Sequence, residues 1–230
     1  MAKKKESTLV NMLVALLVIA AVSGGVLGLV YGVTKDAIAQ GEEKKNNDAI
    51  KAVLPLKEVT YTIDTIIYTD TTGVTTAFPC TRVCDSISGD FKGMAIKTSE
   101  GGFGGKIDLM VGITADDTIR GISVLSHSET PGLGANMDKV LVGQFADKKP
   151  GDHFSFQVTK TKEKGKVDAI TAATITSKAF TKAVEKAYEA FKANKANYIT
   201  STPVVEETPV TEETPVEENN ETMEGGQDNE

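Results

Sequence analysis

An uncharged apolar run is the first pattern along the chain. It extends from Leu9 to Val33, and as a helix it would span roughly 37 Å at about 1.5 Å per residue. That length crosses a bilayer core of about 30 Å. The segment Ala37–Ala39 resembles a signal-peptide cleavage site, but the apolar region of a signal is shorter, about 7–15 residues. We therefore predict a retained transmembrane helix over residues 9–33.

The charges that flank this run predict its orientation. Lys3, Lys4 and Lys5 precede it, whereas residues 35–51 carry both signs. Because positive flanks stay on the cytoplasmic side, residues 1–8 are expected in the cytoplasm. Everything after residue 33 is then expected outside the cytoplasm.

Beyond the apolar run, the pattern changes to short elements. A helix is predicted from Thr34 to about Leu54, where Pro55 ends it. Four β-rich runs follow, at Val59–Ile67, Phe91–Thr98, Lys106–Ile113 and Ile119–Ser126. The last two are joined by a hairpin at Asp116-Asp117. Phe154, Phe156 and Val158 alternate with polar residues, which predicts a further half-buried strand.

Helical spacing returns over Ala135–Phe145 and Thr176–Lys195. The second segment carries one apolar stripe, best explained as core packing, made of Phe180, Val184, Ala187, Tyr188 and Phe191. The fold class is therefore α+β, with one N-terminal transmembrane helix and a mixed domain over residues 34–200.

The end of the chain has a different composition. Residues 201–230 contain the repeats TPVVEE, TPVTEE and TPVEEN, and from Pro203 to Glu230 there are ten acidic residues and no Lys or Arg. Such a segment buries too little apolar surface to order itself, so we predict a disordered acidic tail. Without it, 22 acidic residues stand against 25 basic ones, and the formal charge of −7 becomes +3. That balance gives no case for nucleic-acid binding.

The segment from Asp168 to Lys178 is a run of small and hydroxyl residues that opens the last helix. Helix N-termini present unpaired amides and partial positive charge, which suit a phosphate. Ala172 and Ala173 allow close approach of the backbone, and the candidate hydroxyls are those of Thr171, Thr174, Thr176 and Ser177. On these residues alone, ordinary helix capping is the better explanation.

A second candidate segment is Ser126-His-Ser-Glu-Thr-Pro-Gly-Leu-Gly134, where a strand end enters a glycine-rich loop. Pro131 and the two glycines give a tightly turned backbone that can approach a flat ligand. Without further context, a plain connection with a solvated Glu129 is the favoured interpretation.

The threonine-rich segment resembles the flavinylation signature of the FMN-binding domain family, Ser/Thr-Gly-Ala-Thr followed by a further Ser or Thr. The resemblance implies that Thr174 is esterified to the FMN phosphate by a separate flavin transferase that uses FAD. Thr171 takes the first position, and Ala172 stands where glycine is commoner. Asp168 matches the acidic position that precedes the signature.

The glycine-rich loop is similar to the His-x-Glu-Thr-Pro-Gly-Leu-Gly motif of the G subunit of the Rnf electron-transport complex. By resemblance, the residues that line the flavin are Glu129, Thr130, Leu133 and Gly134. The stretch Gly101–Gly105, before the run that begins at Lys106, matches the glycine-rich approach to the central strand of that family.

Taken together, the resemblance implies an electron-transfer subunit of an ion-translocating ferredoxin:NAD oxidoreductase in a bacterial cell membrane. Its cofactor would be covalent FMN, and its partners other membrane and iron–sulfur subunits, with no catalytic residue of its own. One alternative is the C subunit of the sodium-pumping NADH:quinone oxidoreductase, which carries a close variant of the loop motif. Another is a non-redox, membrane-anchored scaffold protein.

Cys80 and Cys84 form a C-x-x-x-C pair with no second pair nearby in the sequence. A metal site is disfavoured by that spacing, and a disulfide in the exported domain is the preferred interpretation. The sequence contains no G-x-G-x-x-G, so nothing indicates bound NAD.

Overall fold

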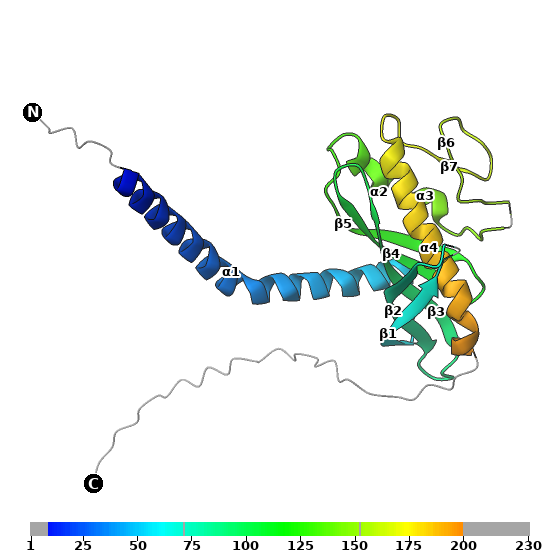
Figure 1. Cartoon of the computed structure of the whole chain (residues 1–230). Coiled ribbons are helices and arrows are strands. Elements are labelled where there is room, and N and C mark those ends of the chain that lie inside the picture. Colours follow the sequence, from blue (N-terminus) through cyan, green and yellow to red (C-terminus); the bar gives the residue numbers. More distant parts are fainter. Residues whose placement is uncertain (1–8, 71, 152, 200–230) are drawn as a thin grey trace, which may run out of the picture.

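A meander of five antiparallel strands forms the centre of this computed structural model, which describes residues 9–70, 72–151 and 153–199 (Figure 1). The strands pair in chain order: β1 (Val59–Thr69), β2 (Thr75–Asp85), β3 (Phe91–Gly101), β4 (Lys106–Thr114) and β5 (Ile119–His127). Four of these were predicted, and the α+β class is confirmed. The hairpin between β4 and β5 also lies where it was expected.

The strand β2 was not predicted, because its first half contains Pro79 and follows Gly73. Proline normally argues against a central strand, since it cannot donate to the ladder. Here β2 pairs with β1 along its whole length but with β3 only from Cys80 onward. Residues 75–79 therefore have a partner on one side only, where a proline is tolerated.

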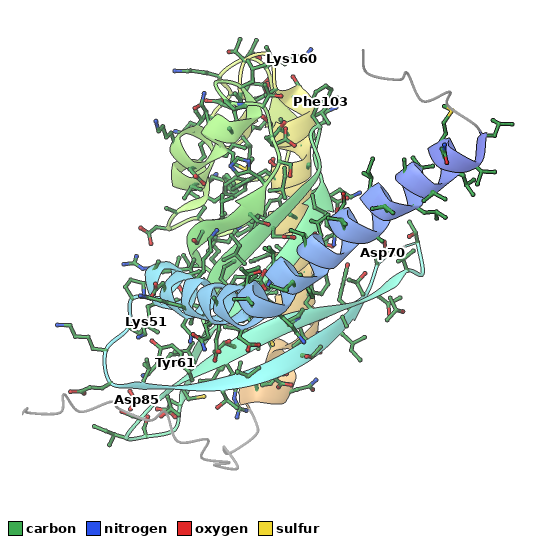
Figure 2. All side chains as sticks on the ribbon, turned by 90° about the vertical axis from the view of Figure 1, so that its left-hand side faces the viewer. Lys51, Tyr61, Asp70, Asp85, Phe103 and Lys160 are labelled. Carbon is green, nitrogen blue, oxygen red and sulfur yellow. The ribbon has the colours of Figure 1, made fainter. Side chains whose placement is uncertain are left out.

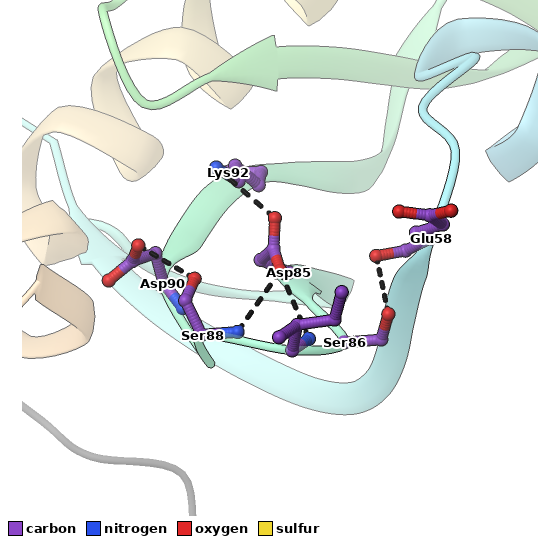
Figure 3. A network of polar contacts seen from close by, with 7 residues as sticks. Glu58, Asp85, Ser86, Ser88, Asp90 and Lys92 are labelled. Atoms are coloured by element: carbon purple, nitrogen blue, oxygen red, sulfur yellow. Dashed lines mark hydrogen bonds and ion pairs between the residues drawn. The ribbon is translucent and has the colours of Figure 1, made fainter.

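Asp85 holds the turn between β2 and β3 (Figure 3). Its carboxylate accepts a hydrogen bond from the Ser88 amide at 3.1 Å and pairs with Lys92 at 3.4 Å. The Ser86 hydroxyl donates to the Glu58 carbonyl oxygen at 2.7 Å. The turn is thereby attached to the residue that precedes β1.

One face of the sheet is covered by the last helix, α4 (Thr174–Ile199). Its predicted apolar stripe is buried, with Phe180, Val184, Ala187 and Phe191 fully inaccessible to solvent. These side chains pack against Ile96, Leu109 and other residues of the inward face of the sheet. Full burial of a Phe or Val contributes about 1.5–3 kcal/mol, so this layer supplies much of the stability of the domain.

The other face of the sheet receives the end of α1, which runs without a break from Leu9 to Val53 (Figures 1 and 2). The predicted membrane segment is its N-terminal half, with a mean hydropathy of 2.7 and none of that window buried in the protein. The C-terminal end of α1 packs through Ala49, Val53 and the following Leu54. The helix is confirmed, and the predicted domain boundary at residue 34 falls inside it.

Two glycines allow α1 to reach the sheet. At Gly112 on β4, an added Cβ would lie 2.5 Å from the Val53 carbonyl oxygen, and at Gly121 on β5 it would lie 3.2 Å from the Val53 Cα. The Lys45 ammonium also donates to the Leu125 carbonyl oxygen. The backbone of the helix therefore contacts the backbone of the sheet, with no side chain between them.

The segment from Gly134 to Phe145 is less regular than the predicted helix. It contains a 3-10 turn (η1, Gly134–Asn136) and two single turns, α2 (Met137–Val140) and α3 (Val142–Phe145). Met137, Leu141 and Phe145 are nevertheless fully buried, because the i, i+4, i+8 spacing survives the break between the turns.

The strand predicted over residues 154–158 is largely wrong. Only β6 (Val158–Thr159) pairs, in parallel, with β7 (Val167–Asp168). Phe154 and Phe156 instead join an aromatic cluster, with ring centroids 5.6 Å from Phe154 to Phe145 and 5.8 Å from Phe156 to Tyr188. The alternation of apolar residues in this part of the sequence therefore reflects the packing of aromatic rings and not the pairing of a β-strand.

The preferred disulfide between Cys80 and Cys84 is also wrong. Both are buried free thiols. They lie four residues apart on one extended strand, so their Cα atoms are separated by about 13 Å, well beyond the reach of a disulfide. Burial raises the pKa of the Cys80 thiol to about 12, which keeps it protonated and unreactive.

The predicted cytoplasmic residues 1–8 and the predicted tail, residues 201–230, lie outside the described residues.

We predict that Gly112→Ala destabilises the protein by about 1–3 kcal/mol, the usual cost of overpacking. The new methyl group would collide with the Val53 carbonyl oxygen and move the end of α1 away from the sheet. Denaturant unfolding of the full chain in detergent measures this. Gly143→Ala, with no atom within 4 Å of its added Cβ, is the control. Equal stability of the two variants would contradict the close packing.

Candidate functional site

Two loops and the start of α4 enclose a cleft of about 350 Å³. Its lining comes from segments far apart in the sequence: Phe103, Glu129, Thr130, Leu133, Gly134, Ala172, Ala173, Thr174, Ile175 and Thr176. The two sequence segments that were predicted to form one site therefore do meet in space. Eight of the ten predicted site residues line this cleft.

The first wall follows β5. The Leu133 amide donates to the Thr130 carbonyl oxygen at 3.2 Å, which closes a turn around Pro131 and Gly132. Gly132 has φ +79°, and a proline followed by a residue with positive φ is the pattern of a type II turn. This turn presents Thr130 and Leu133 to the cleft.

The second wall uses a turn with the same hydrogen-bond pattern. The Ala173 amide donates to the Ile170 carbonyl oxygen at 3.0 Å, and Ala172 has φ +61°. An alanine thus occupies the left-handed position that a type II turn normally gives to glycine. This explains in physical terms why glycine is commoner at the position of Ala172. Directly after the turn, α4 begins at Thr174.

Two of the predicted hydroxyl residues do not line the cleft. Ser177 is fully buried, where its hydroxyl accepts from the Ile170 amide at 2.9 Å and donates to the Ala173 carbonyl oxygen at 2.9 Å. It therefore holds the turn in place. Thr171 is exposed on the turn and outside the lining. Thr174 is the half-buried hydroxyl residue at the helix start.

Glu129 joins the parts of the site. It is only 5% exposed, so the interpretation of a solvated side chain is wrong. One carboxylate oxygen accepts from the Gly104 amide at 3.0 Å, and the other accepts from the Thr176 hydroxyl at 2.6 Å. Glu129 belongs to the loop after β5. Its carboxylate therefore links this loop by hydrogen bonds to the glycine-rich loop before β4 and to the first turn of α4.

Glycines surround this carboxylate because no side chain would fit. An added Cβ at Gly102 or at Gly134 would lie closer than 3.0 Å to a Glu129 carboxylate oxygen, and one at Gly104 would lie equally close to the Ser128 carbonyl oxygen. The glycine-rich stretch therefore serves the packing of Glu129.

The sequence interpretation missed two lining residues, Phe103 and Ile175. They are 71% and 57% exposed, and Leu133 is 41% exposed. Three large apolar side chains thus stand at the rim of the cleft without being buried in the core. The signal for Phe103 was present, since an aromatic residue between glycine pairs is unusual in a plain turn, but nothing in the sequence assigned it to the cleft.

The electrostatics of the cleft favour an anion at the helix end. The first amides of α4 have no intrahelical acceptor, and the helix carries partial positive charge there. No acidic residue lies in its first turn. The carboxylate of Glu129 already accepts two hydrogen bonds. The cleft thus combines an amide-rich helix end, of the kind that suits an anion, with an apolar rim.

A family model described as the FMN-binding domain matches residues 102–189. Both walls of the cleft fall within that range. NqrC of Shewanella oneidensis shares the fold, with a TM-score of 0.54 and 18% identity, over 69% of this chain and 99% of that one. Fold and site therefore define a protein of the FMN-binding domain class, carried on an apolar helix long enough to cross a membrane.

The more specific family follows from relatives that align with most of the chain. The G subunit of the proton-translocating ferredoxin:NAD(+) oxidoreductase complex of Clostridium ljungdahlii is 33% identical, over 73% of this chain and 83% of its own length. The G subunit of the ion-translocating oxidoreductase complex of Methanosarcina acetivorans is 34% identical, over 85% of this chain and all of its own. This chain belongs to the family of G subunits of ion-translocating oxidoreductase complexes.

We predict that Glu129→Ala destabilises the domain by about 1–3 kcal/mol, because the buried Thr176 hydroxyl loses its acceptor. Glu129→Gln should cost less, since the Gln amide group can donate to that hydroxyl while its oxygen still accepts. Denaturant unfolding of both variants checks this. A Gln variant as unstable as the Ala variant would contradict this explanation, because Gln keeps the shape and the hydrogen-bonding groups of the side chain and lacks only its negative charge.

A second prediction concerns the turn before α4. Ala172→Gly should raise the free energy of unfolding by about 0.5–1 kcal/mol, because relief of the left-handed strain outweighs the entropy of the added glycine. Ala173→Gly, one residue on and buried, has no positive φ to relieve and should lower it. Thermal unfolding of both variants tests the left-handed conformation of Ala172. If the two substitutions change the stability in the same direction, that conformation is not the source of strain.

Proposed function

We propose that this chain is an electron-transfer subunit of an ion-translocating ferredoxin:NAD oxidoreductase complex, with FMN held through a phosphoester to Thr174. The observation that supports the attachment most directly is the position of Thr174. It is the first residue of α4, at the amide-rich end of the helix, and it lines the cleft between apolar side chains.

The residues of the cleft fit an FMN. A phosphate on the Thr174 oxygen would meet the free amides of the first turn of α4, an arrangement typical of phosphate sites. The exposed side chains of Phe103, Leu133 and Ile175 offer apolar surfaces for a flat aromatic ring. Thr130 and Ala172 complete the cleft between these two regions.

The attachment itself is a phosphoryl transfer. Thr174 would provide the acceptor oxygen: a P–O bond to the FMN phosphorus would form as the pyrophosphate bond of FAD breaks on the flavin transferase, with AMP as the leaving group and loss of the threonine proton. When bound, a flavin supplies the redox chemistry, while the protein orients it and sets its surroundings.

The apolar half of α1 anchors the domain in a membrane. With Lys3, Lys4 and Lys5 before it, the N-terminus lies in the cytoplasm and the FMN domain outside. A covalent bond would retain the flavin in a compartment without a free supply. Other membrane and iron–sulfur subunits of the complex are the partners. The relatives, which are named as G subunits and are 33–34% identical, favour this complex over the sodium-pumping quinone reductase, because NqrC of Shewanella oneidensis is only 18% identical to this chain.

We predict that Thr174→Ala abolishes flavin attachment, because the other hydroxyl that α4 brings to the cleft, on Thr176, is buried and donates to Glu129. The full chain and the variant are co-expressed with a flavin transferase. The wild-type protein should give a fluorescent band in a denaturing gel, and its Thr174 peptide should gain the mass of one FMN less one water. An unmodified wild-type peptide from cells with active transferase would falsify the proposal and leave the scaffold alternative.

Thr171→Ala is the matched control. Thr171 is an exposed hydroxyl residue on the same turn but outside the lining of the cleft. Its loss should reduce attachment less than the loss of Thr174. Persistence of the band in Thr174→Ala would move the attachment to another residue.

A further inference from the structure

The loop between β6 and β7 carries the densest group of unpaired lysines on the described domain. Residues 160–166 contain four lysines and one glutamate. Lys166 pairs with Glu163 at 2.7 Å. Lys160, Lys162 and Lys164 are exposed, and none has a carboxylate within 4.0 Å among the residues that the structure describes.

Elsewhere the domain neutralises several of its cations. Lys182 and Lys186 both pair with Glu100, at 3.5 and 2.6 Å, and Lys195 pairs with Asp117 at 2.7 Å. The lysine loop is therefore unusual in having three successive unpaired charges at alternate positions. In Figure 2, Lys160 and Phe103 lie at the same end of the domain, and Phe103 lines the cleft.

The C-terminal segment of the same chain is rich in negative charge. Its last 28 residues, from Pro203, hold ten carboxylates and no Lys or Arg, while the rest of the chain has a net charge of +3. The lysine loop contributes no residue to the lining of the cleft. Attraction between them is favourable at low ionic strength and falls as salt screens it.

The acidic segment is long enough to reach the loop. It follows Ile199, the last residue of α4, and 31 residues come after that position. Extended, they span up to about 100 Å, whereas α4 itself is about 39 Å long. The length of α4 lies well within this distance.

We propose that the acidic segment, residues 203–230, binds the lysine loop, residues 160–166, of its own chain. The contact consists of exposed carboxylate–ammonium pairs, each weak, that act together. It offsets the positive charge of the loop. This inference does not depend on the attachment of FMN to Thr174.

Protection of the lysine loop by the acidic segment is tested by limited trypsin digestion of the full chain in detergent. It is compared with a variant of the same length in which the ten acidic residues of the segment are replaced by Gln or Asn. At low ionic strength, cleavage after Lys160, Lys162 and Lys164 should be about fivefold slower in the wild-type protein. The difference should disappear at about 0.5 M salt. Lys57, in the exposed loop between α1 and β1, is the control site, with equal cleavage expected in both proteins.

The location is tested by zero-length carbodiimide cross-linking of the wild-type chain, with mass-spectrometric mapping. The expected products join peptides from residues 203–230 to the lysines of the loop. Equal cleavage of the loop in both proteins at low salt would overturn the proposal. So would equal protection of Lys57, or cross-links concentrated on the lysines of α1. Flavin fluorescence of the same samples reports separately on FMN attachment.

Discussion

The buried carboxylate of Glu129 is the constraint on which the geometry of the cleft depends. A carboxylate without partners in such a site would be costly, and its two oxygens accept from the Gly104 amide and the Thr176 hydroxyl. Three segments that are remote in sequence are therefore held at fixed distances. The glycines at 102 and 134 are a consequence, since the carboxylate occupies the space where their side chains would be.

The same sheet carries both the cleft and the membrane helix. Gly121 on β5 lies against Val53 at the end of α1, and the same strand ends at His127, two residues before Glu129. Because the end of α1 touches the backbone of β4 and β5 directly, the strands that lead to the cleft are fixed to that end of the helix.

Much of this arrangement could be predicted from local patterns, and the failures share a cause. The apolar run, four strands and the last helix follow from periodicity, and both site segments follow from their motifs. The strand β2 was hidden because Pro79 is tolerated only where a neighbouring strand is absent, which depends on the assembled sheet. The buried state of Glu129 and the position of Phe103 in the cleft depend on contacts between distant segments, which no local pattern contains.

The open shape of the cleft bears on why a covalent bond would be useful there. Ligand sites normally bury about 70–90% of the ligand surface, yet three of the apolar side chains here stand 41–71% exposed around a cleft of about 350 Å³. Non-covalent binding at such a site must offset the loss of translational and rotational freedom with few contacts. With the phosphoester proposed at Thr174, this cost would not recur after attachment, because the flavin could not diffuse away. The walls would then need only to orient the ring, which would leave it accessible to electron-transfer partners.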